Sequence, residues 1–207
     1  MSRRLTAAAL ALAAIALSGC ISLFPKAEPA QLYRFEAQPP SQAASAGPVF
    51  GVLRLGTSFP RASASDRILT VNDRGEAAYI AGARWVSPAS VLFDEQVAGA
   101  FQGDGGRARL IGRGEMVKAD FSLKLDVRTF EVRYDRGPKT APEIAVAVRG
   151  IITRNRDRAL VGEQVFTARV RAGENRVGSI VQAFNATVTQ VIGEIAAWVN
   201  AVDTTGT

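Results

Sequence analysis

Hydrophobic positions near the C-terminal end of the chain recur with the period of a helix. Between residues 177 and 199 the apolar side chains follow one another at spacings of three and four, so they form one stripe. The stripe is about six turns long, and we expect a helix that lies across a sheet and covers one of its faces. We interpret Phe184 and Trp198 as core residues of this helix. The full stripe is Val177, Ile180, Val181, Phe184, Val188, Val191, Ile192, Ile195, Trp198 and Val199.

Alternation with a period of two predicts strands in the middle of the chain. Apolar residues occupy every second position from Phe121 to Val127, and they do so again with the opposite parity from Phe130 to Tyr134. A change of parity requires an extra residue, so we predict a β-bulge near Arg128-Thr129. Two further strands, 144–153 and 165–170, flank a turn at 155–158, which predicts a three-stranded antiparallel meander.

Shorter patterns in the first half predict further elements. An Asn/Asp/Gly turn at 72–75 separates two apolar runs, which favours a hairpin. Ser87 is a typical helix N-cap and Pro88 suits a first helical position, so a helix is expected from there to about Phe101. Leu32 to Phe35 is a β-prone run that we expect to dock as an edge strand. The other expected strands are 49–55 and 107–111.

Residues 1–19 have the features of a bacterial export signal. Two arginines precede Leu5–Leu17, an apolar run with one Thr. The run is shorter than the about 20 residues of a membrane-spanning helix, but it suits a signal peptide. It ends in Leu17-Ser18-Gly19-Cys20, which resembles the lipobox of bacterial lipoproteins. We predict cleavage before Cys20 and lipid attachment, with palmitate-type acyl chains, to its thiol. The alternatives are an uncleaved anchor or an ordinary secretory signal.

The chain is then expected to have four parts. They are a lipoprotein signal peptide (1–19), a lipidated cysteine with a flexible tether rich in Pro, Ala and Ser (20–47), one domain (48–202) and a polar tail (203–207). The element order predicts an α+β fold with a mainly antiparallel sheet and helices packed on one face. The residue after the cysteine is Ile21. In enteric-type bacteria, an Asp at this position favours retention of a lipoprotein in the inner membrane. We therefore expect the periplasmic face of the outer membrane, with the inner membrane as the alternative.

Composition excludes several kinds of chemistry. The chain has no His and a single Cys, which excludes Cys/His zinc sites, Ser-His-Asp and Cys-His nucleophiles, and an internal disulfide. Asp120 and Asp126 are interpreted as solvated residues of one strand, and the glycine-rich segments 103–106 and 112–114 as turns. The net charge of +6 comes from scattered arginines, which does not indicate nucleic-acid binding. We predict no catalytic residue, no metal and no cofactor.

Several short motifs occur together in this chain. Asp66-Arg67-Ile68 precedes Tyr79 and Trp85, and Ala119–Phe130 and Ala183-Phe184-Asn185 follow. With the lipobox, this order and spacing resembles the ABC-type transport auxiliary lipoprotein family, the PqiC-like periplasmic lipoproteins, over about residues 32–199. The resemblance implies a partner: a transporter whose periplasmic substrate-binding subunit carries MCE domains, and which moves lipids or other apolar molecules between the inner and outer membranes. It also leaves self-assembly into a homo-oligomer open.

Tyr79, Arg84 and Trp85 form the candidate interface, because Tyr, Arg and Trp are enriched at binding hot spots. The alternative is that Trp85 belongs to the core and Arg84 is an exposed charge. Asp66-Arg67 is a candidate ion pair. Two other functions stay open: a binder of small apolar ligands, with a pocket lined by Phe184, Val188 and Ile192, and a structural envelope-assembly lipoprotein.

Overall fold

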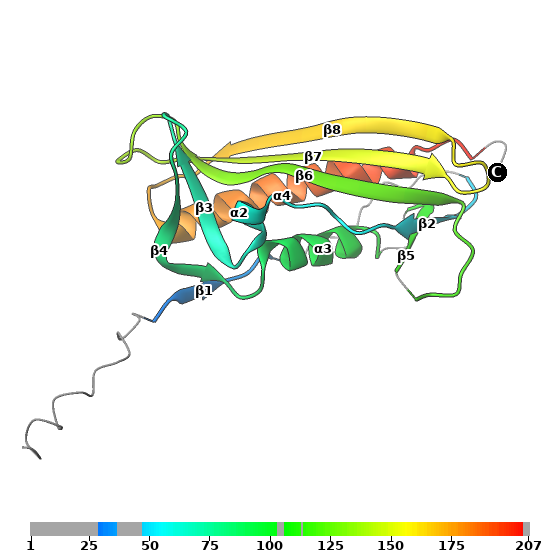
Figure 1. The fold of residues 1–207 in the computed structure, drawn as a ribbon, viewed down its shortest axis with the longest axis horizontal. Helices are drawn as coiled ribbons and strands as arrows, with labels where there is room; N and C mark the ends of the chain where they lie inside the picture. The colour runs from blue at the N-terminus through cyan, green and yellow to red at the C-terminus, as the bar shows by residue number, and fades with distance from the viewer. Residues whose placement is uncertain (1–28, 37–46, 103–105, 113, 205–207) are drawn as a thin grey trace, which may run out of the picture.

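The computed structural model of the chain describes residues 29–36, 47–102, 106–112 and 114–204. They form one elongated body in which the long strands and the longer helices run close to the long axis (Figure 1). The predicted signal peptide, Cys20, most of the glycine-rich segment 103–106 and the last three residues lie outside this described part. Among the described residues, no helix has both the length and the apolar character needed to cross a membrane.

Three long antiparallel strands form the main part of the sheet. β6 (Phe121–Tyr134) pairs with β7 (Glu143–Arg154), and β7 pairs with β8 (Leu160–Arg171). The register of β6 against β7 shifts between Val127 and Thr129, which confirms the predicted bulge. The apolar residues of β6 change from odd to even positions after Val127. The extra residue of the bulge compensates for this change, so the apolar side chains before and after it point to the same inner face.

The other side of β6 pairs with two shorter strands that the sequence order separates. β2 (Phe50–Arg54) pairs in parallel with the beginning of β6, and β3 (Arg67–Asn72) pairs in parallel with its end. An isolated bridge from Ser58 to Asp126 lies between them. The sheet is thus mainly antiparallel, as expected, with parallel pairs added along this side of β6. Alternation reveals that a segment is a strand but not its direction, so the parallel pairing had no signal in the sequence.

Three more strands complete the sheet, and the edge strand is found where it was predicted. β5 (Ala108–Ile111) pairs in parallel with β2, and β4 (Ala77–Trp85) forms the predicted hairpin with β3. β1 (Gln31–Tyr33) pairs in parallel with the end of β4 and ends the sheet on that side. Phe35, just after β1, is buried in the core.

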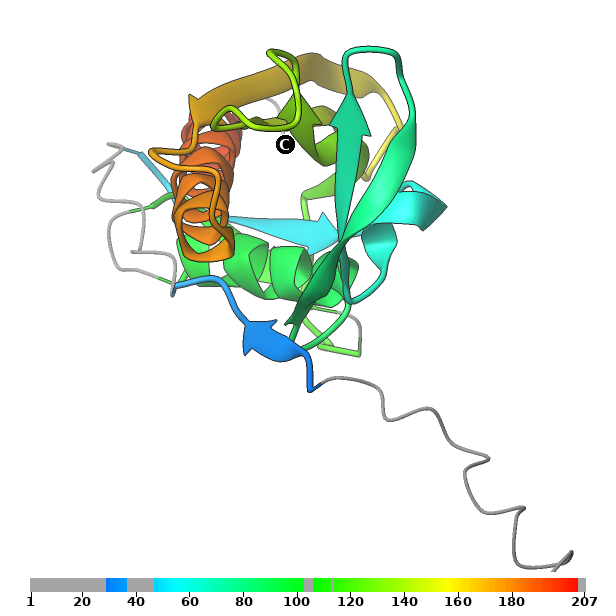
Figure 2. The same cartoon turned by 90° about the vertical axis from the view of Figure 1, so that its left-hand side faces the viewer.

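Helices lie on the concave side of this curved sheet (Figure 2). α4 (Val177–Asn200) is the predicted long helix, and it packs against β7, β8 and α3 (Ala89–Ala100). α3 begins one residue later than expected: its N-cap is Pro88, with no side-chain cap bond, so the prediction of Ser87 as the cap is wrong. The Ser65 carbonyl accepts from the Ala89 N–H instead, and this bond satisfies one of the free N–H groups at the helix start. A short helix, α2 (Arg61–Ala64), was not predicted.

The core lies between the inner face of the sheet and the two long helices. Alternate residues of β7 are buried there, as are the stripe residues Ile180, Phe184 and Ile192 of α4. Near the end of α4, Trp198 packs over two strand glycines: a Cβ on Gly150 would lie 2.9 Å from its ring, and a Cβ on Gly162 would lie 3.2 Å from it. The absence of side chains at these two positions therefore makes the space that the indole occupies.

Candidate functional site

Trp85 belongs to the core rather than to the surface. Its side chain is 2% exposed, and its ring lies 4.7 Å from the ring of Phe35 and 5.3 Å from that of Phe184, measured between centroids. The last residue of β4 points inward, so Trp85 joins the segment after β1 to helix α4. Of the two interpretations of Trp85, interface residue or core residue, the structure supports the core residue.

Tyr79 and Arg84 lie on the outward side of β4. The Arg84 guanidinium donates to the Asp66 carboxylate at 2.8 Å, and both side chains are largely exposed. Asp66 therefore pairs with Arg84 and not with Arg67, so the expected Asp66–Arg67 pair is wrong. Arg67 instead stacks over the Tyr79 ring, 3.7 Å from its centroid, because the irregular β3–β4 register brings the two together. The Tyr79 hydroxyl donates to the Ala62 carbonyl of α2.

The residues suggested for an apolar ligand pocket are packed against other side chains. Phe184, Val188 and Ile192 are at most 2% exposed, and the Phe184 ring lies 5.1 Å from that of Phe130. Aromatic rings from β4, β6 and the segment after β1 occupy the space in front of Phe184. This part of α4 contributes to the core.

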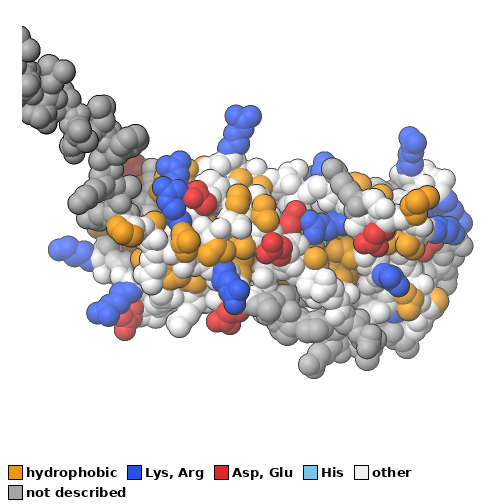
Figure 3. Space-filling view, turned by 90° about the horizontal axis from the view of Figure 1, so that it is seen from below, with side chains coloured by type: hydrophobic (Ala, Val, Ile, Leu, Met, Phe, Trp, Pro, Cys, Tyr) orange, Lys and Arg blue, Asp and Glu red, His pale blue; other side chains and the backbone are white. Residues whose placement is uncertain are grey.

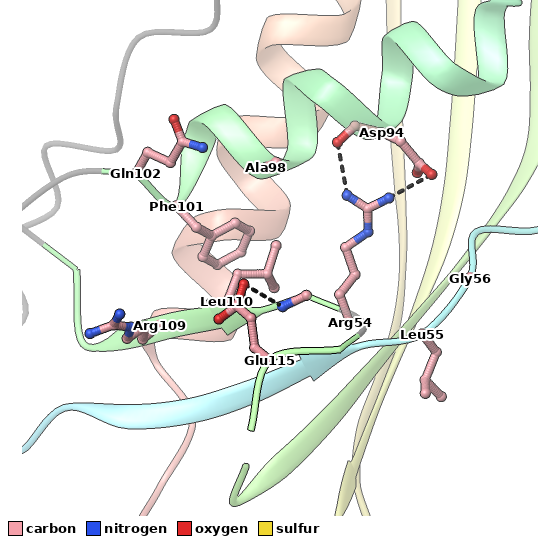
Figure 4. A pocket seen from close by; sticks show the side chains of 11 residues that line it. Arg54, Leu55, Gly56, Asp94, Ala98, Phe101, Gln102, Arg109, Leu110 and Glu115 are labelled. Atoms are coloured by element: carbon pink, nitrogen blue, oxygen red, sulfur yellow. Dashed lines mark hydrogen bonds and ion pairs between the residues drawn. The ribbon is translucent and has the colours of Figure 1, made fainter. Parts of the chain in front are cut away.

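A cleft of about 710 Å³ opens elsewhere, between the C-terminal half of α3 and strands β2 and β5 (Figure 4). Phe101 and Leu110 form apolar parts of its wall, and Leu55, which also lines it, is 38% exposed. The neighbouring segment carries Met116, whose side chain is fully exposed, and Val117, which is 52% exposed. Exposed apolar residues beside a concave surface are typical of a binding surface.

An ion pair fixes one side of this cleft. The Arg54 guanidinium contacts the Asp94 carboxylate at 2.5 Å and donates to the Asp94 carbonyl at 2.9 Å, which ties the end of β2 to α3. The Thr57 hydroxyl donates to the other carboxylate oxygen at 2.7 Å. Both charges of the pair are therefore satisfied within the protein. Sequence reasoning missed this pair, because nothing in the two local patterns links residues 40 positions apart.

Two further charged side chains line the cleft. Glu115 accepts from the Gly112 N–H at 3.2 Å, so it closes the turn that leads to Met116. Arg109 is exposed, and its guanidinium is drawn at the margin of the cleft in Figure 4. Within the described part of the chain, no hydrogen bond or ion pair engages the Arg109 side chain. Its charge is available to a binding partner.

Shifted pKa values occur on the surface and have simple causes. Arg171 donates to both carboxylate oxygens of Asp135, at 2.9 and 2.8 Å, and this lowers the pKa of Asp135. The bond from Arg149 likewise lowers the pKa of Glu163. Burial raises the pKa of the Tyr134 hydroxyl. Glu163 pairs across β7 and β8, Asp135 pairs from the turn after β6 with the end of β8, and neither carboxylate lines the cleft.

Asp120, just before β6, and Asp126, within it, have structural partners. The Asp120 carboxylate accepts from the Gly51 N–H at 3.1 Å and is only 23% exposed, so it is less solvated than expected. Asp126 pairs with Arg128 on the outer face. In the described ranges, no group of three or more acidic, His or Cys side chains is arranged to hold a metal ion.

The described residues thus form a curved sheet with a packed aromatic core and an open, partly apolar cleft. The chain belongs to the family of ABC-type transport auxiliary lipoprotein components, whose family model matches residues 33–196. The match begins at the last residue of β1 and ends in α4, so it includes strands β2 to β8 completely. No curated protein sequence matches the chain.

Solved structures share the fold. Protein XCC0632 from Xanthomonas campestris is similar at 24% sequence identity, with a TM-score of 0.74 over 83% of this chain and 95% of that one. An uncharacterized protein is similar at 12% identity, with a TM-score of 0.63 over 83% of this chain and 99% of its own. The hypothetical protein CT253 from Chlamydia trachomatis is 11% identical, with a TM-score of 0.51 over 74% and 97% of the two chains.

Proposed function

We propose that this protein is a non-enzymatic, lipid-anchored periplasmic component of an ABC transporter that moves lipids or other apolar molecules between the inner and outer membranes. In this proposal it contacts the MCE-domain subunit of the transporter. The observation that carries the proposal is the family match over residues 33–196, which names a transport auxiliary lipoprotein. The cleft, whose wall the Arg54–Asp94 ion pair holds in place, offers a concave surface on which a partner could bind.

We assign the contact with the MCE subunit to the cleft and its exposed margin. Met116 and Val117 offer apolar surface, and Arg109 offers a charge that has no partner in the described residues. A few exposed apolar and Arg side chains commonly supply most of the affinity of a protein interface. This surface therefore provides suitable anchors for a protein partner.

Co-purification of the full-length lipoprotein with the MCE subunit tests the proposal. Detergent extracts of cells that express both proteins should yield the MCE subunit with wild-type protein. The double variant Arg109→Glu, Met116→Ser should recover at least about tenfold less, since loss of one or two hot-spot residues removes about 2 kcal/mol or more. Val165→Ser is the matched control, because Val165 is 49% exposed on β8, away from the cleft. Failure of the wild-type protein to recover the MCE subunit would reject this partner.

Attachment at Cys20 to the outer membrane is the second part of the proposal. It is supported by the lipobox-like sequence and by Ile21, which is not the Asp that retains lipoproteins at the inner membrane in enteric-type bacteria. Cys20→Ala should leave a precursor of higher mass, whereas wild-type protein should carry lipid and fractionate with outer membranes. Ile21→Asp should keep the lipid but move the protein toward the inner-membrane fraction. Normal maturation of Cys20→Ala would contradict the anchor.

A further inference from the structure

We propose that the outward face of β1 and of the end of β4 lies against the lipid surface that holds the anchor. This inference rests on the proposed lipid attachment at Cys20. It adds an orientation: the end of the molecule that carries β1 faces the membrane, and the end that carries the β7–β8 hairpin points away from it. Figure 1 shows these two features at opposite ends of the long axis.

The length of chain between Cys20 and the domain supports this orientation. Gln31, the first residue of β1, is eleven positions after Cys20. Eleven residues reach at most about 40 Å, whatever conformation they adopt. β6 alone has fourteen residues, and a strand of that length extends about 45 Å. The segment between Cys20 and β1 is therefore too short to reach from β1 to the opposite end of the domain. The lipid on Cys20 must then lie nearer to the end of the molecule that carries β1.

The side chains on this face suit the boundary between water and lipid. Figure 3 shows hydrophobic and basic side chains next to one another at this end of the molecule. Leu32 is opposite Arg84 in the register of β1 and β4, and the Val86 N–H donates to the Tyr33 carbonyl at 2.8 Å, which continues the pairing. Neighbouring strand residues point to opposite faces, so Leu32, Arg34, Arg84 and Val86 share the outward face while Trp85 points inward. Leu32 is 60% exposed, Val86 is 48% exposed, and the Arg84 side chain is 47% exposed.

The charges around these residues favour a negatively charged surface. Arg34 is exposed and has no hydrogen bond or ion pair within the described part of the chain. Arg67 lies opposite Arg84 in the β3–β4 ladder, and Asp66 neutralises one of these charges. Glu36 is the other nearby exposed carboxylate. The balance is positive, and long Arg side chains reach phosphate groups while their stems stay on apolar surface.

A second copy of the chain or another protein fits this face less well. β1 has only three residues, which is too short for stable pairing of strand edges between two molecules. Four exposed side chains also provide far less than the about 800 Å² per partner of a typical protein interface. A membrane contact needs no such area, because the anchor already keeps the lipid surface at high effective concentration.

Fluorescence quenching in reconstituted vesicles tests the orientation with the full-length lipoprotein. Cys20 is the only cysteine of the chain, so once it is lipidated an introduced cysteine is the only free thiol. Leu32→Cys and Val86→Cys place a thiol-reactive fluorophore on the proposed face. Leu160→Cys is the matched control, since Leu160 is 62% exposed and begins β8 at the other end of the molecule. The vesicles contain phosphatidylethanolamine and phosphatidylglycerol, with a fraction of nitroxide-labelled lipid as quencher.

We expect the probes at 32 and 86 to be quenched at least about twofold more than the probe at 160, because apolar residues at an interface reach about 5–10 Å into it. Circular dichroism checks that each labelled variant is folded. Equal quenching at the three positions in lipidated, vesicle-bound protein would overturn the orientation and leave the anchor intact. Disulfide crosslinking of two unlabelled Leu32→Cys chains under a mild added oxidant would assign the face to a second copy instead. Mass spectrometry that finds no lipid on Cys20 would overturn both the anchor and the orientation.

Discussion

Single aromatic side chains connect segments of this protein that are far apart in the sequence. Phe184 of α4 contacts the rings of Phe130 on β6 and Trp85 on β4, at centroid distances of 5.1 and 5.3 Å. Each aromatic pair adds about 0.5–1.5 kcal/mol beyond the burial of area. These rings also link the segment after β1 to the core through Phe35. Phe184 is thus placed to contribute more to stability than most residues of the helix.

Replacement of Phe184 by alanine tests this contribution. Phe184→Ala removes a ring that is 1% exposed, so the free energy of unfolding should fall by about 3–5 kcal/mol through lost burial and a remaining cavity. Urea unfolding followed by circular dichroism measures the change. Val91→Ala on α3 is the control, and since Val91 is 44% exposed its effect should stay within about 0.5 kcal/mol. Equal effects of the two variants would contradict the packed core at Phe184.

The Asp135–Arg171 pair predicts a pH dependence of stability. Arg171 lowers the pKa of Asp135 in the folded protein, so the pair stabilises the fold above the ordinary pKa of Asp, and this stabilisation is lost as the pH falls through the lowered value. The difference in free energy of unfolding between wild type and Arg171→Gln should therefore shrink as the pH falls from about 5 to about 2. Urea titrations at several pH values measure it. Arg61→Gln, on exposed α2, should show a difference from wild type that does not change with pH.

At the scale of elements, the sequence predicted best what depends on local periodicity. The long helix, the meander, the hairpin and the bulge near Thr129 all follow from spacing within one segment, and the structure confirms them. The parallel pairing of β2 and β3 with β6 joins segments far apart in the chain, and periodicity carries no information on direction. The cleft depends in the same way on Arg54 meeting Asp94 across 40 positions. The expected pair Asp66–Arg67 was wrong because the register shift places Arg84 nearer to the carboxylate.

The contact of α4 with the β7–β8 pair depends on strand glycines, which gives a prediction at this scale. In Gly150→Ala the new methyl would lie 2.9 Å from the Trp198 ring and 3.2 Å from that of Phe166. The helix end must then shift, and the free energy of unfolding should fall by about 1–3 kcal/mol. Gly193→Ala is the matched variant on α4, because its added Cβ would meet no side chain beyond its chain neighbours, and no other segment, within 4 Å. It should leave stability unchanged or raise it by up to about 1 kcal/mol in thermal unfolding. A neutral Gly150→Ala would contradict close packing at Trp198.

At the scale of the whole molecule, the folded part begins at the predicted edge strand near Leu32–Phe35 and not at the expected domain boundary. The domain was expected to start at residue 48, with 20–47 as a tether. Yet β1 completes one edge of the sheet, and Phe35 is 5% exposed beside Trp85. The family match also begins at residue 33. Residues 31–35 are therefore part of the fold, and the stretch of sequence between Cys20, the proposed anchor, and the folded part is correspondingly short.

Two truncated chains test where the domain begins. A chain that starts at Pro29 keeps β1 and Phe35, and it should unfold at the same temperature as one that starts at Cys20. A chain that starts at Ala37 loses both, and its free energy of unfolding should fall by at least the about 3–5 kcal/mol expected for loss of a buried Phe side chain. Phe35→Ala in the chain that starts at Pro29 distinguishes the contribution of the Phe35 ring from that of the β1 pairing. We expect this variant to reproduce most of the decrease in the free energy of unfolding. Equal stability of the Ala37 and Pro29 chains would return residues 31–35 to the tether, and the membrane would then lie farther from β4 than the orientation proposed above requires.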